Sequence, residues 1–203
     1  MNNWNKLADR NTVERTISAL KTNGIEAYFV ENKEAAKAKV LKLLLKGAEV
    51  MNMSSVTLNT ISIADEIIES GNYNSVRNML EKMDRKTQNR EMQQLGAAPE
   101  WVVGSVHAVT EAGQILVASM TGSQLPAYAY GASYVMWVAG AQKIVKDIDE
   151  GLKRIYEYCL KLENARAMKA YGISSSVNKI LIINKEVQPG RISLIIVNEL
   201  LGF

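Results

Sequence analysis

The sequence predicts an α/β protein with a mostly parallel sheet and helices on both of its faces. Segments with helical periodicity alternate with short apolar runs over residues 1–140, which is typical of parallel β-α-β units. The run Tyr134–Ala139 is almost continuously apolar, as expected of a strand covered on both faces. Two more apolar runs, Lys179–Asn184 and Ile192–Asn198, are joined by a turn at Pro189-Gly190, which predicts an antiparallel pair at an edge.

Composition indicates one folded unit. The chain has 203 residues, 47% of them hydrophobic, so we expect a single domain over residues 1–203 with a helical insertion at about 72–98. The 24 basic and 21 acidic residues are interspersed, which argues against a nucleic-acid surface. The single cysteine, Cys159, excludes an internal disulfide and a multi-cysteine metal site. Without a long apolar run or signal peptide, we expect a cytoplasmic protein with no membrane contact, no metal and no required cofactor.

The first five elements follow from caps, periodicity and glycines. Their expected order is a helix capped by Asn11 and stopped by Gly24, the strand Ile25–Val30, a helix from Asn32 to Gly47, the strand Ala48–Met53, and a helix from Ser54-Ser55 to about Ser70. The two serines either cap that last helix or leave its free amides to bind an anion. The polar stretch 72–98 predicts one or two surface helices, as a solvated insertion or as a lid or oligomer contact.

The segment 101–140 holds most of the candidate polar residues. We expect a strand at Trp101–Val103 that Ser105–Val109 continues, a turn at residues 111–114, and a strand at Ile115–Ser119. Ser123 is expected to cap a short helix with Pro126 in its first turn. After residue 140, Asp147 caps the longest helix, and the spacing of its apolar stripe places Cys159 on the buried face.

Four features of this region could carry chemistry. Glu111 could act as a base or as a nucleophile. Alternatively, its carboxylate accepts hydrogen bonds from the amides of its own turn. His107, the only histidine, is either a structural hydrogen-bonded residue or a general base. The loop Thr121–Gln124 offers amides and hydroxyls suited to an anion, and Lys143 could supply a cation or face solvent. The sequence has none of the patterns GxGxxG, GxxxxGK[ST], GxSxG or CxxC.

The pattern of small and polar residues resembles the LUD-domain family, named for lactate utilisation. The likeness rests on Ala108, Thr110, Glu111 and Gly113, on Thr121, Gly122, Ser123 and Gln124, on Val138, Gly140, Lys143, Ile144 and Val145, on Asp147, Asp149 and Glu150, and on the end segments 53–57 and 198–203. It implies a three-layer α/β/α fold similar to ribose-5-phosphate isomerase, the CoA transferases and formyltetrahydrofolate cyclo-ligase. Some members of the family act beside iron–sulfur subunits in lactate oxidation. This chain has no cysteine cluster, and His107 stands where relatives often have a polar, Asn-like residue.

Two functional hypotheses follow, and the sequence leaves open whether the protein is an enzyme. In the first, a cleft at strand ends binds a small anion of carboxylate, phosphate or CoA type, with Glu111 as possible base or nucleophile and His107 as an accessory residue. The expected ligand-binding residues are Ser54, Ser55, Thr57, Thr110, Gly113, Thr121, Gly122, Ser123, Gln124 and Lys143. In the second, the protein is a non-catalytic subunit that docks with an iron–sulfur oxidoreductase partner or forms a homo-oligomer.

Overall fold

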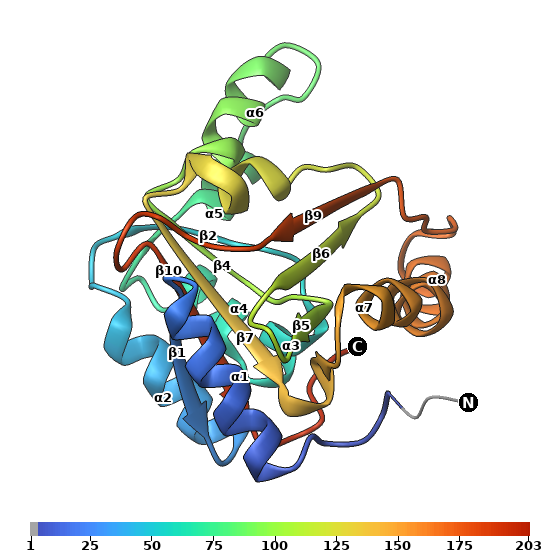
Figure 1. The fold of residues 1–203 in the computed structure, drawn as a ribbon. Coiled ribbons are helices and arrows are strands. Elements are labelled where there is room, and N and C mark those ends of the chain that lie inside the picture. Colours follow the sequence, from blue (N-terminus) through green and yellow to red (C-terminus); the bar gives the residue numbers. More distant parts are fainter. Residues whose placement is uncertain (1–3) are drawn as a thin grey trace.

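The computed structural model describes residues 4–203 and contains two sheets (Figure 1). Six strands of the described chain form the main sheet, and all of its neighbouring strands are parallel. In spatial order they are β1 (Glu26–Val30), β10 (Ile192–Val197), β7 (Tyr134–Gly140), β4 (Trp101–Gly104), β2 (Glu49–Asn52) and β3 (Asn74–Ser75). The predicted parallel sheet is confirmed, with β3 as an additional strand inside a segment that shows no strand pattern in the sequence.

A second, mixed sheet packs over one face of the main sheet. Its four strands are, in spatial order, β8 (Ile144–Val145), β5 (Ala108–Thr110), β6 (Ile115–Ser119) and β9 (Lys179–Ile183). The β5–β8 pair is parallel, whereas β6 is antiparallel to both β5 and β9. Apolar side chains of β5 and β6 share one core cluster with β7 and β10, so the two sheets enclose a common core.

The expected C-terminal hairpin does not form, which corrects one part of the sequence prediction. β10 lies between β1 and β7, parallel to both, and β9 pairs antiparallel with β6 in the other sheet. Burial explains the difference, because all six residues of β10 are buried while β9 is only half-buried. A strand that is apolar on both faces gains most by lying inside the parallel sheet. An antiparallel C-terminal strand is therefore present, but it lies in the second sheet.

Helices complete the layers. One face of the main sheet is covered by α2 (Lys33–Leu43), α3 (Val56–Thr60) and α4 (Ile63–Glu69), which share a core cluster with β2, β4, β7 and β10. The other face carries α1 (Arg10–Thr22) together with the second sheet. The outer side of the second sheet packs against α7 (Ile148–Arg154), the start of a long helix that runs on as α8 (Leu160–Tyr171). The predicted α/β/α layering is confirmed, with the small sheet as an addition to one side.

Two helix starts agree with the sequence and two do not. Asn32 caps α2 and Asp147 caps α7, each accepting a backbone N–H as predicted. The first helix is capped by Asp9 rather than Asn11, because the Asp9 carboxylate accepts the N–H of Thr12. Ser123 does not cap a helix. Pro126 does lie in the first turn of a short helical segment, as predicted, and the segment continues as one turn of π-helix, η1 (Ala127–Gly131).

The helix expected after Ser54-Ser55 is divided in two. Ser55 caps α3, its Oγ accepting the N–H of Leu58 at 3.4 Å, as the capping interpretation predicts. The chain then breaks at Ser62, whose φ is +53°, before α4 begins. Ser105–Val109 likewise does not extend β4, because the chain leaves the main sheet after Gly104 and enters the second sheet at β5.

The segment 72–98 forms β3, α5 (Val76–Glu81) and α6 (Asn89–Ala97), so the two predicted surface helices are present. α6 buries none of its residues, and it stands out from the body at the top of Figure 1. The long C-terminal helix contains one turn of π-helix, η3 (Ile155–Cys159), and the connection from β7 to β8 is a short 3₁₀ turn, η2 (Ala141–Lys143). Within residues 4–203, no helix combines the length and hydropathy that crossing a bilayer requires.

Candidate functional site

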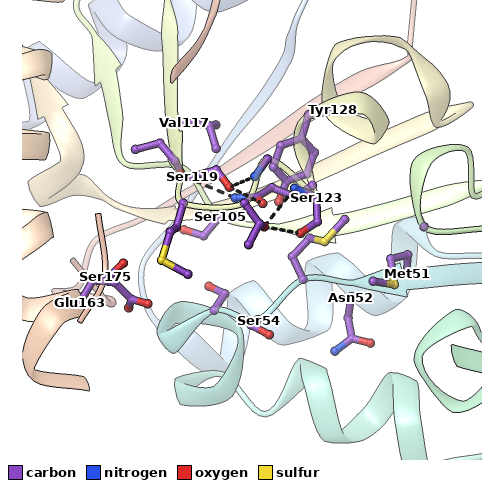
Figure 2. Close-up of a pocket in the computed structure, with 18 of the residues that line it drawn as sticks. Met51, Asn52, Ser54, Ser105, Val117, Ser119, Ser123, Tyr128, Glu163 and Ser175 are labelled. Atoms are coloured by element: carbon purple, nitrogen blue, oxygen red, sulfur yellow. Dashed lines mark hydrogen bonds between the residues drawn. The ribbon is translucent and has the colours of Figure 1, made fainter. Parts of the chain in front are cut away.

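A wide cleft of about 1680 Å³ opens where β2, β4 and β7 reach their carboxyl ends. This is the edge at which parallel sheets usually bind ligands. α3 and the β2 end form one wall, and β6 with the loop after it forms another, while α8 and the chain after it close a third side. Figure 2 shows these walls by Asn52 and Ser54 below, Ser119, Ser123 and Tyr128 above, and Glu163 and Ser175 to one side.

Lys143 lies on the inner surface of this cleft and is 2% exposed. It ends the 3₁₀ turn that follows β7, so the main sheet holds its backbone rigidly. Its Nζ donates to the Val106 carbonyl at 3.0 Å, to Ser105 Oγ at 3.0 Å and to Thr57 Oγ1 at 3.2 Å. No carboxylate of the described residues forms an ion pair with it. A buried ammonium without a counter-charge is costly, so this arrangement needs an explanation.

The two hydroxyls beside Lys143 have different freedom. Thr57 Oγ1 donates to the Leu201 carbonyl at 3.2 Å, so its hydrogen is committed to the backbone. Ser105 Oγ donates to Thr57 Oγ1, also at 3.2 Å, and this hydrogen can instead rotate toward Lys143 Nζ. With Ser105 turned one way, the three acceptors satisfy an ammonium. With Ser105 turned the other way, its hydroxyl donates to the lone pair of a neutral amine, whose two hydrogens go to the Val106 carbonyl and Thr57 Oγ1.

A second buried cation lies behind the cleft wall. Arg154 is fully buried, and its Nη1 donates to the His107 carbonyl and to Cys159 Sγ, the latter at 2.9 Å. Its Nε and Nη2 have no hydrogen-bond partner among the described residues. No carboxylate of the described residues forms an ion pair with Arg154. Cys159 itself lines the cleft from the π-helical turn, a kind of local distortion that is frequent at functional sites. The region around Lys143 is therefore electropositive without a compensating carboxylate.

Burial and these cations shift the titration of three groups in the cluster. Burial, reinforced by Arg154, lowers the pKa of Lys143 to about 7. Burial, then Lys143 and Arg154, lowers the pKa of His107 to about 3, so its imidazole is neutral at physiological pH. Burial raises the pKa of the Cys159 thiol, although Arg154 and Lys143 oppose the rise. The one group of this cluster that changes charge near neutral pH is Lys143.

Both the ring and the backbone carbonyl of His107 form hydrogen bonds within the fold. Its Nδ1 accepts the N–H of Ala118 at 3.1 Å across the β5–β6 pair, so the neutral ring carries its hydrogen on Nε2. Its backbone carbonyl holds Arg154. Both contacts support the structural interpretation of the histidine, although its ring also lines the cleft.

The β2 end of the cleft carries a polar rim. Arg77 Nε donates to the Asn52 carbonyl at 3.0 Å, and its Nη2 donates to Ser54 Oγ at 2.7 Å. The side-chain oxygen Oδ1 of Asn52 is buried and lacks a partner among the described residues. Arg77 comes from α5, so the insertion 72–98 contributes directly to this rim.

The loop Thr121–Gln124 lines the cleft, but much of its hydrogen-bonding capacity is already used. Ser119 Oγ accepts the N–H of Gly122 at 2.8 Å and donates to Gln124 Oε1 at 2.9 Å (Figure 2). Thr121 Oγ1 donates to Ser123 Oγ at 3.2 Å. The loop therefore forms a rigid wall with exposed hydroxyls rather than a set of free amides.

The turn with Thr110, Glu111 and Gly113 lies outside the cleft lining. Glu111 Oε2 pairs with Arg15 Nη2 at 3.1 Å, and Gly113 packs so closely on α1 that a Cβ would lie 2.7 Å from the Ala19 carbonyl carbon. The reason is topological, because this turn closes the β5–β6 hairpin at the end opposite Ser119. A catalytic role for Glu111 stays a prediction from the sequence, and its geometry lends it no support.

The structure thus brings together most of the predicted residues and separates three of them. The predicted residues that line the cleft are Ser54, Ser55, Thr57, His107, Thr121, Gly122, Ser123, Gln124 and Lys143. Sequence reasoning missed Ser105, Arg77 and Arg154. Ser105 carries a usable signal as a small polar residue directly after a strand, whereas nothing local marks Arg154 as buried. No group of three or more His, Cys, Asp or Glu residues within residues 4–203 is arranged to hold a metal ion.

Comparisons with known proteins show solved structures that are similar to this chain. The solved structure of a DUF162 family protein from Deinococcus radiodurans is 12% identical, with a TM-score of 0.56, over 95% of this chain and 100% of that one. At this identity the likeness concerns the fold. Ribose 5-phosphate isomerase from Plasmodium falciparum is 11% identical, with a TM-score of 0.37, over 78% of this chain and 80% of that one.

A search of curated proteins found no match. The model of the LUD domain, in contrast, matches residues 13–197, which span both sheets and nearly all the helices. That range includes every predicted residue of the cleft. The chain therefore belongs to the LUD domain family.

Proposed function

We propose that the cleft binds a small anionic metabolite of the carboxylate, phosphate or CoA class, with Lys143 as its principal cation. The observation that carries this proposal is the burial of the Lys143 amine without a carboxylate partner among the described residues. An anion that enters the cleft would supply the missing counter-charge in surroundings of low dielectric, where ionic attraction is strong. Arg154 adds to the positive potential from behind the wall.

The remaining polar groups suit a ligand with more than one polar part. Ser105 and Thr57 lie beside the amine, and Arg77 with Ser54 forms the rim at the β2 end. The cleft of about 1680 Å³ is larger than the roughly 300–1,000 Å³ of an ordinary small-molecule pocket, so an extended CoA-type ligand would also fit. Glu111 is not part of this proposal, because it lies outside the lining.

Ligand-induced thermal stabilisation tests the proposal. The probes are acetyl-CoA, ribose 5-phosphate and lactate, applied to the wild type, Lys143→Met and Lys161→Met, the last being an exposed lysine outside the cleft. At a hundredfold excess over Kd a bound probe stabilises by about 2.7 kcal/mol. We expect at least one probe to stabilise the wild type and Lys161→Met but not Lys143→Met. Equal shifts in all three proteins, or none with any probe, would contradict the proposal.

A second candidate function is a non-catalytic subunit that docks with an oxidoreductase partner. Its support is α6, which buries none of its residues and projects from the body. Most of α6 also lines the cleft, but the side that carries Glu91 and Leu95 does not, and it is available as a contact surface. Its test is binding of a purified iron–sulfur oxidoreductase subunit by the wild type and by Glu91→Lys, a charge reversal on α6 outside the cleft. We expect Glu91→Lys to bind the oxidoreductase subunit more weakly than the wild type does, while anion binding in the cleft stays unchanged. Equal binding of the subunit by both proteins would contradict this second candidate.

A further inference from the structure

We propose that Lys143 reacts as a nucleophile and forms a Schiff base with the carbonyl carbon of an anionic aldehyde or ketone bound in the cleft. This inference rests on the proposed function, because it names the chemical class of the anion. Lys143 is the one fully buried lysine of the described residues, and it is among the residues that line a cleft large enough for a substrate.

The first requirement of such chemistry is an amine that is not held in its protonated form. A carboxylate in contact with a lysine stabilises the ammonium, and no described carboxylate pairs with Lys143. Its charged and titratable neighbours are instead Arg154 on α7, which favours the neutral amine, the neutral imidazole of His107, and the Cys159 thiol on the π-helical turn. Desolvation by the surrounding core acts in the same direction as Arg154. About half of the amine is therefore neutral near pH 7.

The second requirement is a lone pair that can point at a substrate. The neutral amine has two hydrogens, which the Val106 carbonyl and Thr57 Oγ1 can accept. Its lone pair then faces Ser105, whose hydroxyl either donates to it or turns back to Thr57. Rotation of this one hydroxyl toward Thr57 removes the hydrogen bond to the lone pair, and the amine then has to turn from the Ser105 oxygen, 3.0 Å away, to reach a carbonyl carbon in the cleft. Ser105 and Thr57 are thus positioning residues for the amine.

The reaction balances without any further reagent. The nitrogen lone pair attacks the carbonyl carbon, a C–N bond forms, and the carbonyl π electrons move to oxygen, which takes up a proton. One amine proton passes to this oxygen to give the carbinolamine, and the second amine proton is given up as the oxygen gains another and departs as water. Amine and carbonyl compound thus give imine and one water, which holds both amine hydrogens. The Ser105 hydroxyl, whose hydrogen can rotate, is placed to pass a proton from nitrogen toward the leaving oxygen. When protonated, the imine draws electrons from the adjacent carbon, which is the usual purpose of lysine Schiff bases.

Borohydride trapping tests this step directly. The folded wild-type protein is mixed with glyoxylate at pH 7, sodium borohydride is added, and peptides are analysed by mass spectrometry. Borohydride delivers hydride to the imine carbon and leaves a stable carboxymethyl amine on the lysine that reacted. An amine in water, with a pKa of about 10.4, is neutral to only about one part in a thousand or less at this pH. We expect Lys143 to carry at least about tenfold more label than exposed lysines such as Lys161.

Two variants and one separate measurement make the outcome decisive. Lys143→Arg keeps the charge but cannot form the imine, so the excess label must disappear, whereas Lys161→Arg must keep it. If Lys143 in the folded wild type carries no more label than Lys161, the Schiff base is excluded. Thermal shift with acetate and inorganic phosphate then tells whether anion binding also fails. Stabilisation of the wild type by either anion would leave the proposed function standing with a purely electrostatic lysine.

Discussion

The chemistry of the cleft depends on one side chain, Lys143, whose amine is buried beside two hydroxyls and near a second buried cation. A lysine in such a place is stable only through the balance of desolvation, hydrogen bonds and bound anions. Small changes in its surroundings should therefore be measurable in its protonation. Three predictions follow at the level of single residues.

The first prediction concerns stability against pH. The folded-state pKa of Lys143 lies near 7, below its ordinary value of 10.5, so the unfolded chain binds more protons between these two values. The free energy of unfolding should therefore rise with pH above about 7, by roughly 1.4 kcal/mol per pH unit at most. Urea unfolding of the wild type and Lys143→Met up to about pH 8.5, the ordinary pKa of a thiol, measures this. The slope should be flatter in the variant. Identical slopes would mean that Lys143 titrates normally.

The second prediction concerns Arg154. Arg154 lowers the pKa of Lys143, so Arg154→Met should raise that pKa and move the pH midpoint of glyoxylate labelling upward. The substitution leaves the His107 carbonyl without its donor, at a cost of about 1–3 kcal/mol, but removes an unpaired buried charge. The net change in stability should thus be small. An unchanged labelling midpoint in a folded Arg154→Met protein would disprove the electrostatic coupling.

The third prediction concerns Glu111. Its side chain is 37% exposed and pairs with Arg15, so Glu111→Gln should change the free energy of unfolding by less than about 1 kcal/mol. It should also leave ligand-induced stabilisation of the cleft unchanged, which thermal shift with the probes above would show. Loss of ligand binding in this variant would restore the interpretation of Glu111 as a site residue.

At the scale of elements, some features depend on local sequence and others depend on tertiary packing. The caps at Asn32, Ser55 and Asp147 are visible in the sequence because an N-cap depends on residues within one turn. The π-helical turns after Pro126 and Arg154 have no such signature, because they are imposed by what the helices pack against. Both turns contribute to the cleft lining, η1 through Tyr128 and η3 through Ile155 and Cys159.

The anchoring of α6 can be tested with two glycines. A Cβ on Gly131 would lie 1.9 Å from the Ala97 carbonyl oxygen, so Gly131→Ala should push α6 away from the π-helical turn and destabilise the protein by about 1–3 kcal/mol. For Gly96, inside α6, no atom outside the local helix backbone lies within 4 Å of that position, and Gly96→Ala should stabilise by about 0.5–1 kcal/mol. Urea unfolding compares the two. Equal effects of both substitutions would show that the contact at Gly131 does not hold α6.

At the scale of the whole molecule, the cleft exists because three strand ends and the second sheet converge. Ser54 and Thr57 follow β2, Ser105 follows β4 and Lys143 follows β7. That small polar residues after parallel strands share one edge is predictable, and most of the predicted residues do line the cleft. The turn at Glu111 lies away from the cleft because its hairpin belongs to the second sheet and points the other way.

The sequence by itself determined the alternation of elements, the parallel main sheet, the caps at Asn32, Ser55 and Asp147, and the LUD family resemblance, since each depends on periodicity or on neighbours within a few residues. Only the tertiary structure decided that β9 and β10 separate into two sheets, because both are apolar runs and the choice depends on how many faces are covered. It also decided that Lys143 and Arg154 are buried. Burial of a charged side chain is set by residues far away in the chain, and no local pattern records it.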